Sequence, residues 1–409
     1  MSADSTERLH ALDAVRGFAL LLGIVFHATV SFLPSPPGVP VWIVMDSHRS
    51  LALGLVFHVL HTFRMTAFFL IAGFFAHMSL QRRGTRGFVL DRLKRIGVPL
   101  LVGWPILLAA ILGGAVWGAV VSAHGGPLPK AAPYAGLPAF PLTHLWFLYV
   151  LLLLYAGTLA IRGLVLAVDR SGAVGRAADR AVRAVIRNPL GPLVLAAPTF
   201  AALCAAPAWL MWFGIPTPDS SLVPNFAASV GFSTAFGLGW MVHRQPALLE
   251  VWRRRWALNL ALATAFTVAG LCITGPAPLL RPVAGWSRFA FAGGYTLAIW
   301  TWSFGLIGAA LRFLSGFSPV RRYIADASYW LYLIHLPIVL ALQVAVSQLD
   351  WPWFVKFPAI LAFAFPLMFA SYALLVRHTF IGAVLNGRRP PRRPRTNGLP
   401  SPAESASPI

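Results

Sequence analysis

Charged residues are scarce in this sequence, and acidic residues are the scarcest of them. Only 11% of the 409 residues are Asp, Glu, Lys or Arg, and 12 of these are acidic. The two cysteines, Cys204 and Cys272, both fall inside apolar runs, so neither a disulfide framework nor a metal site is indicated. A chain of this length with so little charge is not typical of a soluble protein.

Apolar residues are abundant instead. They make up 58% of the sequence, and the mean hydropathy is +0.71. A bilayer accepts apolar runs of about 20 residues, the length of a helix that crosses it. We therefore predict an all-α integral membrane protein with about ten transmembrane helices. They are expected near residues 12–33, 50–78, 97–121, 142–167, 190–214, 222–243, 256–275, 288–313, 323–347 and 352–378.

The basic residues are unevenly distributed among the connections between these segments. The formal net charge is +21, and most Lys and Arg residues fall at the N-terminus, in every second connection and in the C-terminal tail. Because cytoplasmic loops are enriched in Lys and Arg, both termini are predicted to be cytoplasmic. The basic residues form no single surface with interleaved aromatics, so we expect attraction to anionic lipid and no nucleic-acid partner. The polar start, residues 1–10, shows no cleavable signal peptide.

Composition also divides the chain into two parts. Residues 1–380 are expected to form the membrane domain, and residues 381–409, rich in Arg, Pro and Ser, a disordered cytoplasmic tail. Residues 123–141, rich in Gly and Pro, are expected to form an ordered or partly re-entrant outer loop. Residues 169–188 alternate Arg with apolar residues, which predicts an amphipathic helix on the cytoplasmic surface.

Two ionisable residues share one face of the first apolar segment. Arg16 and His27 are eleven residues apart, which is about 20° past three full turns and roughly 16 Å along a helix. Asp13 lies one turn before Arg16, spaced for an intrahelical ion pair. A lone intramembrane histidine can simply be satisfied by a neighbouring helix. With Arg16 and Asp13 beside it, we favour a functional site in which His27 is a general base.

The second segment carries His58, His61 and Arg64 at successive i, i+3 spacings. Arg64 either pins helices together through carbonyl groups or lines a chamber in which a fixed cation stabilises oxyanion charge. His58 and His61 supply only half of a metal site, and no carboxylate lies close in sequence, so no bound metal is expected.

The connection between the second and third segments is the densest basic stretch. Such a cluster can serve only to anchor the cytoplasmic face. Arg92 and Arg95, about one turn apart, could instead grip a polyphosphate. Gly97 and Pro99 are expected to mark the turn into the third segment.

Three further polar residues are candidates. His144 opens the fourth segment on its outer side, and Tyr332 and His335 occupy adjacent positions of the ninth. Pro337 follows closely and is expected to kink that helix.

Taken in order, these segments resemble the acyltransferase-3 family of membrane-bound acyltransferases. The spacing of Arg16 and His27 is similar to its helix-one motif of a basic residue, ten residues and a histidine. Ala72 stands where a serine is common in the family's second-helix signature. The other stretches that resemble family signatures are residues 68–74, 92–99 and 328–337. Residues 63–65 and 144–148 are most similar to the branch that contains the succinyltransferase of osmoregulated periplasmic glucans.

The resemblance implies transfer of an acetyl or succinyl group from cytoplasmic acyl-coenzyme A to a hydroxyl of an extracytoplasmic carbohydrate such as a periplasmic glucan. Acyl-coenzyme A is then a co-substrate, no cofactor is tightly bound, and the protein is a multi-pass component of a bacterial-type cytoplasmic (inner) membrane. The oligomeric state is left open.

The candidate residues divide among three roles under this resemblance. The catalytic candidates are His27, Arg64 and His335. Those expected to bind coenzyme A are Arg16, Arg92 and Arg95. Those expected to bind the acceptor are His58, His61, His144 and Tyr332. Arg64 would stabilise either the tetrahedral oxyanion or the free carboxylate of a succinyl donor.

Two other function classes stay open. In a transporter, His27, Arg16 and Arg64 would form a proton relay or a charged substrate pocket, although the lack of a strong internal repeat weakens this reading. In a membrane sensor or scaffold, the histidines would act as a pH switch, with no turnover. A hydrolase is disfavoured because no Ser-His-Asp grouping or nucleophile elbow is present.

Overall fold

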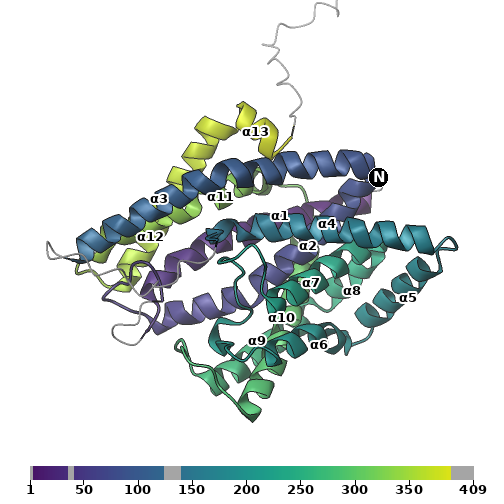
Figure 1. The fold of residues 1–409 in the computed structure, drawn as a ribbon, viewed down its shortest axis with the longest axis horizontal. Helices are drawn as coiled ribbons and strands as arrows, with labels where there is room; N and C mark the ends of the chain where they lie inside the picture. Colours follow the sequence, from purple (N-terminus) through teal and green to yellow (C-terminus); the bar gives the residue numbers. More distant parts are fainter. Residues whose placement is uncertain (1–2, 36–40, 124–139, 388–409) are drawn as a thin grey trace, which may run out of the picture.

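The computed structural model describes residues 3–35, 41–123 and 140–387, and within these residues all regular structure is helical (Figure 1). The all-α prediction is therefore confirmed. The expected outer loop at residues 123–141 lies almost entirely outside the described residues, and so does the tail from residue 388 onward. In chain order the α-helices are α1 (Ala3–Thr29), α2 (Leu51–Arg92), α3 (Val98–Ser122), α4 (Trp146–Val168), α5 (Ala173–Arg187), α6 (Gly191–Cys204), α7 (Phe226–Arg244), α8 (Leu249–Arg254), α9 (Trp256–Thr274), α10 (Trp286–Phe313), α11 (Pro319–Ser347), α12 (Trp353–Ser371) and α13 (Phe380–Leu385).

Seven helical stretches among the described residues are long and apolar enough to cross a membrane. They are His10–Phe32, Leu51–Ser122, Thr143–Val168, Trp256–Thr274, Trp286–Phe313, Pro319–Ser347 and Trp353–Val376. The second stretch is 72 residues long and contains both α2 and α3. The total of about ten spans and the cytoplasmic termini stay predictions.

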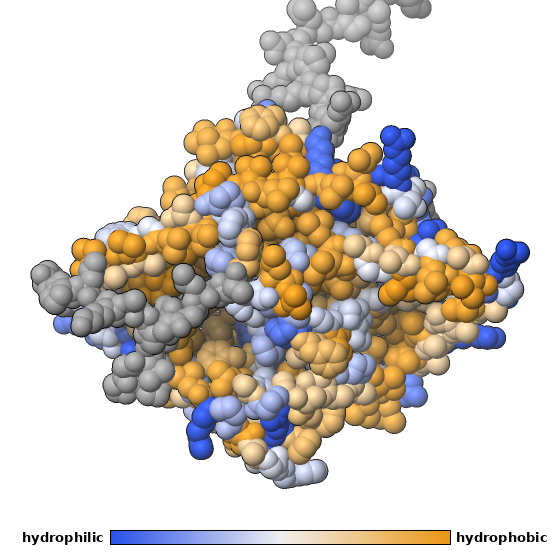
Figure 2. All heavy atoms as spheres, in the orientation of Figure 1, coloured by the Kyte–Doolittle hydropathy of each residue, from blue (hydrophilic) through white to orange (hydrophobic). Residues whose placement is uncertain are grey.

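The surface agrees with a membrane protein. Leu101, Ile106 and Leu164 are each more than 60% exposed, although they lie within long apolar helices. Apolar residues cover much of the face shown in Figure 2, and polar residues gather at its margins and in a central band. Side chains of this kind are stable at a surface that lipid covers, whereas a soluble protein rarely exposes so large an apolar area.

The connection between α2 and α3 differs from the prediction. Gly97 and Pro99 do not form a turn, because a π-helix, η2 (Leu93–Gly97), leads directly into α3. The chain changes direction at Gly84 instead, where φ is +68° and ψ is 175°. Glycine adopts this conformation without the steric penalty that a Cβ atom brings.

The fifth predicted segment, residues 190–214, is also shorter than expected. Its helix α6 ends at Cys204, and the chain continues through turns into a 3-10 helix, η4 (Met211–Phe213). Pro207 explains the early end, because proline has no backbone N–H and disfavours helical geometry in the residue before it.

The structure also bears on two other predicted segments, the amphipathic stretch and the C-terminal boundary of the membrane domain. The amphipathic stretch at residues 169–188 contains helix α5, as predicted, although its place on a membrane surface is not tested. Helix α13 crosses the boundary that the composition suggested at residue 380.

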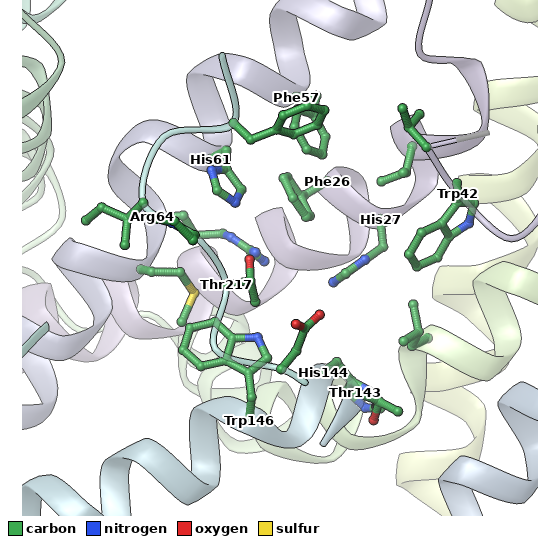
Figure 3. A pocket seen from close by; sticks show the side chains of 18 of the residues that line it. Phe26, His27, Trp42, Phe57, His61, Arg64, Thr143, His144, Trp146 and Thr217 are labelled. Atoms are coloured by element: carbon green, nitrogen blue, oxygen red, sulfur yellow. Dashed lines mark hydrogen bonds between the residues drawn. The ribbon is translucent and has the colours of Figure 1, made fainter. Parts of the chain in front are cut away.

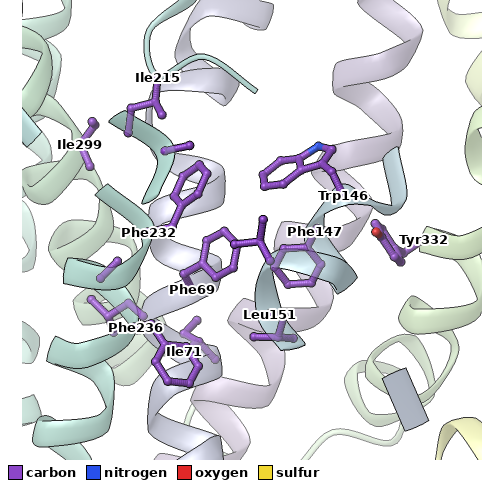
Figure 4. Packing of buried hydrophobic residues seen from close by; sticks show 14 of the residues in the cluster. Phe69, Ile71, Trp146, Phe147, Leu151, Ile215, Phe232, Phe236, Ile299 and Tyr332 are labelled. Carbon is purple, nitrogen blue, oxygen red and sulfur yellow. The ribbon is translucent and has the colours of Figure 1, made fainter. Parts of the chain in front are cut away.

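Three helix contacts position the predicted site residues: α2 with α7, α1 with α2, and α1 with α11. Helix α2 packs against α7 so closely that a Cβ atom at Gly73 or Gly239 would overlap backbone carbonyl groups of the facing helix. Small residues permit this approach between membrane helices. Beside this contact, Phe69 stacks on Phe232 at 4.6 Å and meets Phe147 at 5.0 Å (Figure 4). Helix α1 packs against both α2 and α11, which brings the predicted site residues of three helices together.

Candidate active site

A cavity of about 350 Å³ collects several of the predicted residues. His27 from α1, His61 and Arg64 from α2, and His144 from the turn before α4 all line it. Figure 3 shows the His27 ring and the Arg64 guanidinium directed toward the same central space. We call this cavity the histidine chamber. Helices α1 and α2 therefore bring His27 and Arg64 to one cavity.

Arg64 is positioned by residues of α1. Its guanidinium lies over the Phe26 ring, with the central carbon 4.4 Å from the ring centroid, a cation–π geometry. It also lies against Gly23, where a Cβ atom would collide with its Nη1. Arg64 forms no ion pair within residues 3–35, 41–123 and 140–387. Its charge is therefore directed at the chamber and not at a protein carboxylate.

The chamber holds buried polar atoms without protein partners. They are Nδ1 of His27, Nδ1 of His61 and Nε of Arg64, none of which has a hydrogen-bond partner in the described part of the chain. Nε2 of His335, whose ring lies 5.0 Å from that of His27, is a fourth such atom beside the chamber. Buried polar groups are normally satisfied, and each exception calls for an explanation, such as a catalytic role or a bound ligand. Four such atoms in one region therefore favour a binding or catalytic role for this cavity.

A hydrogen-bonded group connects His335, His144 and Tyr332 beside His27. The Tyr332 hydroxyl donates to the His144 carbonyl oxygen at 2.8 Å, and His144 Nε2 lies 2.9 Å from the Leu333 carbonyl oxygen. His335 Nδ1 lies 2.6 Å from the Tyr332 carbonyl oxygen. A carbonyl oxygen only accepts, so Nε2 of His144 and Nδ1 of His335 must both donate. Nε2 of a neutral His335 therefore keeps a free lone pair. The His335 ring lies 5.0 Å from that of His27.

His58 is not brought into the chamber. It is 3% exposed, its Nδ1 lies 3.0 Å from the Trp212 carbonyl oxygen, and its ring packs against the Trp212 indole. Three positions separate it from His61, and that offset turns the two rings toward different neighbours. The acceptor-binding role expected for His58 therefore has no support from its position.

A second cavity, of about 480 Å³, lies at the other end of α1 and α2 and collects arginines. Arg16, Arg92 and Arg95, the three predicted coenzyme A ligands, line it together with Arg82, Arg83 and Arg322. Asp91 pairs with Arg83, Arg92 and Arg95 at 3.0 Å each, and Arg16 pairs with Asp13 at 3.2 Å. We call this the arginine cavity.

A narrow cavity of about 40 Å³ lies between the other two. It shares His27, Arg64 and His144 with the histidine chamber, and Phe68 and Tyr332 with the arginine cavity. The three cavities therefore follow one another along the face of α1 that carries Arg16 and His27. We call the narrow one the constriction.

Asp219 is a chamber residue that the sequence reasoning missed. It lines the cavity from the connection between α6 and α7, and burial against the chamber walls raises the pKa of its carboxyl. No motif marks Asp219. The available signal was scarcity, since it is one of 12 acidic residues and lies in a connection with no Lys or Arg.

Comparison with known proteins finds one family and several relatives that match this chain. The acyltransferase domain of the acyltransferase-3 family matches residues 9–373. Two relatives called "Glucans biosynthesis protein C", from Escherichia coli strains SMS-3-5 and K12, are 33% and 32% identical over 156 residues. Each alignment covers 38% of this chain and 39% of the relative, so the chain spans about two fifths of their length. No solved structure matches this chain.

Proposed function

Because the chain belongs to the acyltransferase-3 family, we propose that it is an integral membrane O-acyltransferase. In this proposal it moves an acyl group from acyl-coenzyme A to a hydroxyl of an extracytoplasmic carbohydrate. One observation carries the proposal: the arginine cavity, the constriction and the histidine chamber share lining residues in succession. An anionic donor can occupy one end of such a series while its reactive group reaches the other.

The arginine cavity suits the phosphates of coenzyme A. Guanidinium groups bind phosphate oxygens in pairs of parallel hydrogen bonds, and Arg16, Arg92 and Arg95 are gathered there. Nε of Arg92 is buried without a partner among the described residues, which leaves donor capacity for a ligand. We place this cavity on the cytoplasmic side, because the basic connections are expected there.

The constriction suits the thin thioester arm. Its volume of about 40 Å³ admits a chain or a small acyl group and excludes a folded headgroup. An acetyl or succinyl group would then reach His27 and Arg64 with the thioester carbonyl in the chamber.

His27 is the proposed general base. It takes the proton of the acceptor hydroxyl while the hydroxyl oxygen attacks the thioester carbon. The C–S bond then breaks, and the proton passes from His27 to the sulfur of coenzyme A. Arg64 stabilises the negative charge on the carbonyl oxygen in the transition state, or in a succinyl enzyme it holds the free carboxylate. The ring of His335 packs 5.0 Å from that of His27 and forms part of the wall behind it.

The acceptor is proposed to be a periplasmic glucan. The support is the name of the curated relatives, "Glucans biosynthesis protein C", which align with a part of this chain. The setting that follows is a bacterial-type inner membrane, crossed by about ten helices with both termini in the cytoplasm.

Turnover of acyl-coenzyme A by the purified protein tests the proposal. Release of coenzyme A is followed with acetyl- or succinyl-coenzyme A, with and without glucan oligosaccharides, for the wild type and His27→Ala. Release that requires both the acceptor and His27 is the expected result. No release and no donor binding would refute the enzyme and favour a transporter that uses the same histidines and arginines.

A further inference from the structure

A tryptophan outside every motif discussed so far forms one wall of the histidine chamber. Trp42 lies in the connection between α1 and α2 and lines the cavity. Its ring lies 6.0 Å from the ring of His27, and Figure 3 shows both residues at the same side of the cavity. Trp42 is half-buried, so part of the indole is in contact with the chamber.

The indole is held in one orientation by Gln343 of α11. Its Nε1 donates to Gln343 Oε1 at 3.0 Å. The amide nitrogen of Gln343 donates in turn to the His27 carbonyl oxygen at 2.9 Å. Gln343 is 1% exposed, and its amide therefore joins Trp42 to the backbone of His27 itself. The Nε1 edge of the indole is hydrogen-bonded within the protein, while the ring lines the chamber.

The segment that carries Trp42 is anchored at its far end by a buried ion pair. Lys356 of α12 is fully buried and donates to both oxygens of Asp46, at 2.8 and 3.0 Å. The Asp46 amide also donates to the Ser31 carbonyl oxygen at 2.9 Å. Breaking such a buried pair is strongly destabilising. The described residues that follow Trp42 are therefore firmly anchored.

The other walls complete an amphipathic site. Phe57 and Phe213 add apolar surface, and Thr217 and Asp219 add oxygen atoms that can accept hydrogen bonds. A sugar ring presents the matching chemistry, with C–H groups on its faces and hydroxyls at its edge. Pockets of about 300 Å³ or more accommodate small ligands, and the chamber's 350 Å³ lies at that lower limit. It has room for one ring of a longer chain.

We propose that Trp42 is the platform on which the acceptor sugar stacks, with one ring hydroxyl directed at His27. It is thus a residue that determines acceptor specificity and takes no part in donor binding. This inference rests on the proposed function, since it assigns the acceptor side of the same site.

Acceptor binding, measured without any donor, tests the platform separately from turnover. Titration calorimetry uses the whole chain in detergent with the same glucan oligosaccharides as the turnover assay. The variants are Trp42→Ala, Trp42→Phe and a control, Trp351→Ala, whose residue is 48% exposed and does not line the chamber. We expect at least tenfold weaker binding for Trp42→Ala, less than threefold for Trp42→Phe, and no change for the control.

Kinetics then distinguishes direct contact between Trp42 and the acceptor from a purely structural role of Trp42. Trp42→Ala should raise the acceptor KM while the acyl-coenzyme A KM stays within twofold of the wild type. Binding to Trp42→Ala as tight as to the wild type, no oligosaccharide binding by the wild type, or an equal rise in both KM values would overturn the proposal. Wild-type binding that is lost in Trp42→Ala, with no acyl transfer by either, would uphold the platform and reject the acyltransferase.

Discussion

The histidine chamber and the arginine cavity lie along the same two helices, α1 and α2, yet they treat charge in opposite ways. In the arginine cavity the cations are paired, with three arginines on Asp91 and Arg16 on Asp13. In the chamber Arg64 has an aromatic ring and no carboxylate partner in the described residues. Paired arginines near water can exchange partners with an incoming phosphate. A lone enclosed cation is costly unless a ligand or a transition state brings negative charge to it.

The chamber predicts the largest loss. His27→Ala should lower kcat for acyl transfer by about 10² to 10⁴, the usual contribution of a general base. Binding of acyl-coenzyme A should be unaffected, because the phosphates are held in the arginine cavity. His48→Ala is the matched control, since His48 is partly exposed and does not line the chamber. A His27→Ala enzyme within fivefold of wild-type kcat would remove His27 as the base.

The arginine cavity predicts an effect on the donor alone. Arg92→Ala should weaken acyl-coenzyme A binding by about 10- to 100-fold, equivalent to one lost charge-assisted hydrogen bond. The acceptor KM should not change. Arg180→Ala, an exposed position on α5, is the control. If both variants behave alike in a donor titration, the arginines of this cavity serve only to anchor the protein.

Gly23 offers a milder change of the chamber cation. Gly23→Ala places a methyl group where the Arg64 guanidinium now lies, and because that side chain is flexible the fold should tolerate it. We expect kcat to fall about tenfold through misplacement of the charge, with the melting temperature nearly unchanged. Gly157→Ala is the control, because its Cβ would meet open space on another long helix. Equal kcat for both variants would show that the position of Arg64 is not critical.

The smallest effect is expected from a paired charge outside both cavities. Asp179 of α5 accepts from Arg244 at 2.8 Å on both oxygens, and this hydrogen bonding lowers the pKa of the Asp179 carboxyl. The stabilisation should therefore be present above about pH 4 and be lost as the pH falls through the lowered pKa. Asp179→Asn should cost less than about 1 kcal/mol at pH 7, since the pair is partly exposed. Melting curves of wild type and variant should converge in acid; a gap that persists there would point to lost packing.

Part of this fold could be predicted from local patterns in the sequence. Apolar runs predicted helices in nearly every place where the structure has long ones, because a helix in lipid needs only its own residues to satisfy its backbone. The turn at Gly84 and the end of α6 before Pro207 were missed. Both depend on a backbone choice at one residue inside an otherwise apolar or basic stretch, which a hydropathy pattern averages away.

Part of the candidate site could also be predicted from the sequence, again from the properties of single helices. Arg16, His27 and Arg64 are ionisable residues in apolar helices, where each one stands out. His58 is equally conspicuous in the sequence, but its ring is hydrogen-bonded to the Trp212 carbonyl oxygen. Asp219 and Trp42 lie in connections, where such residues are ordinary, so nothing local marked them.

The sequence by itself determined that this chain is a helical membrane protein and placed ionisable groups on the inner faces of its helices. Both follow from the cost of exposing charge and backbone to lipid, which acts on every helix separately. Only the tertiary structure decided which groups meet. Helix packing put Arg64 against Gly23 and His335 beside His27, and Gln343 joined Trp42 to α1 across 301 positions of chain. Contacts between residues so far apart depend on how all the helices fit together, and no local pattern records that fit.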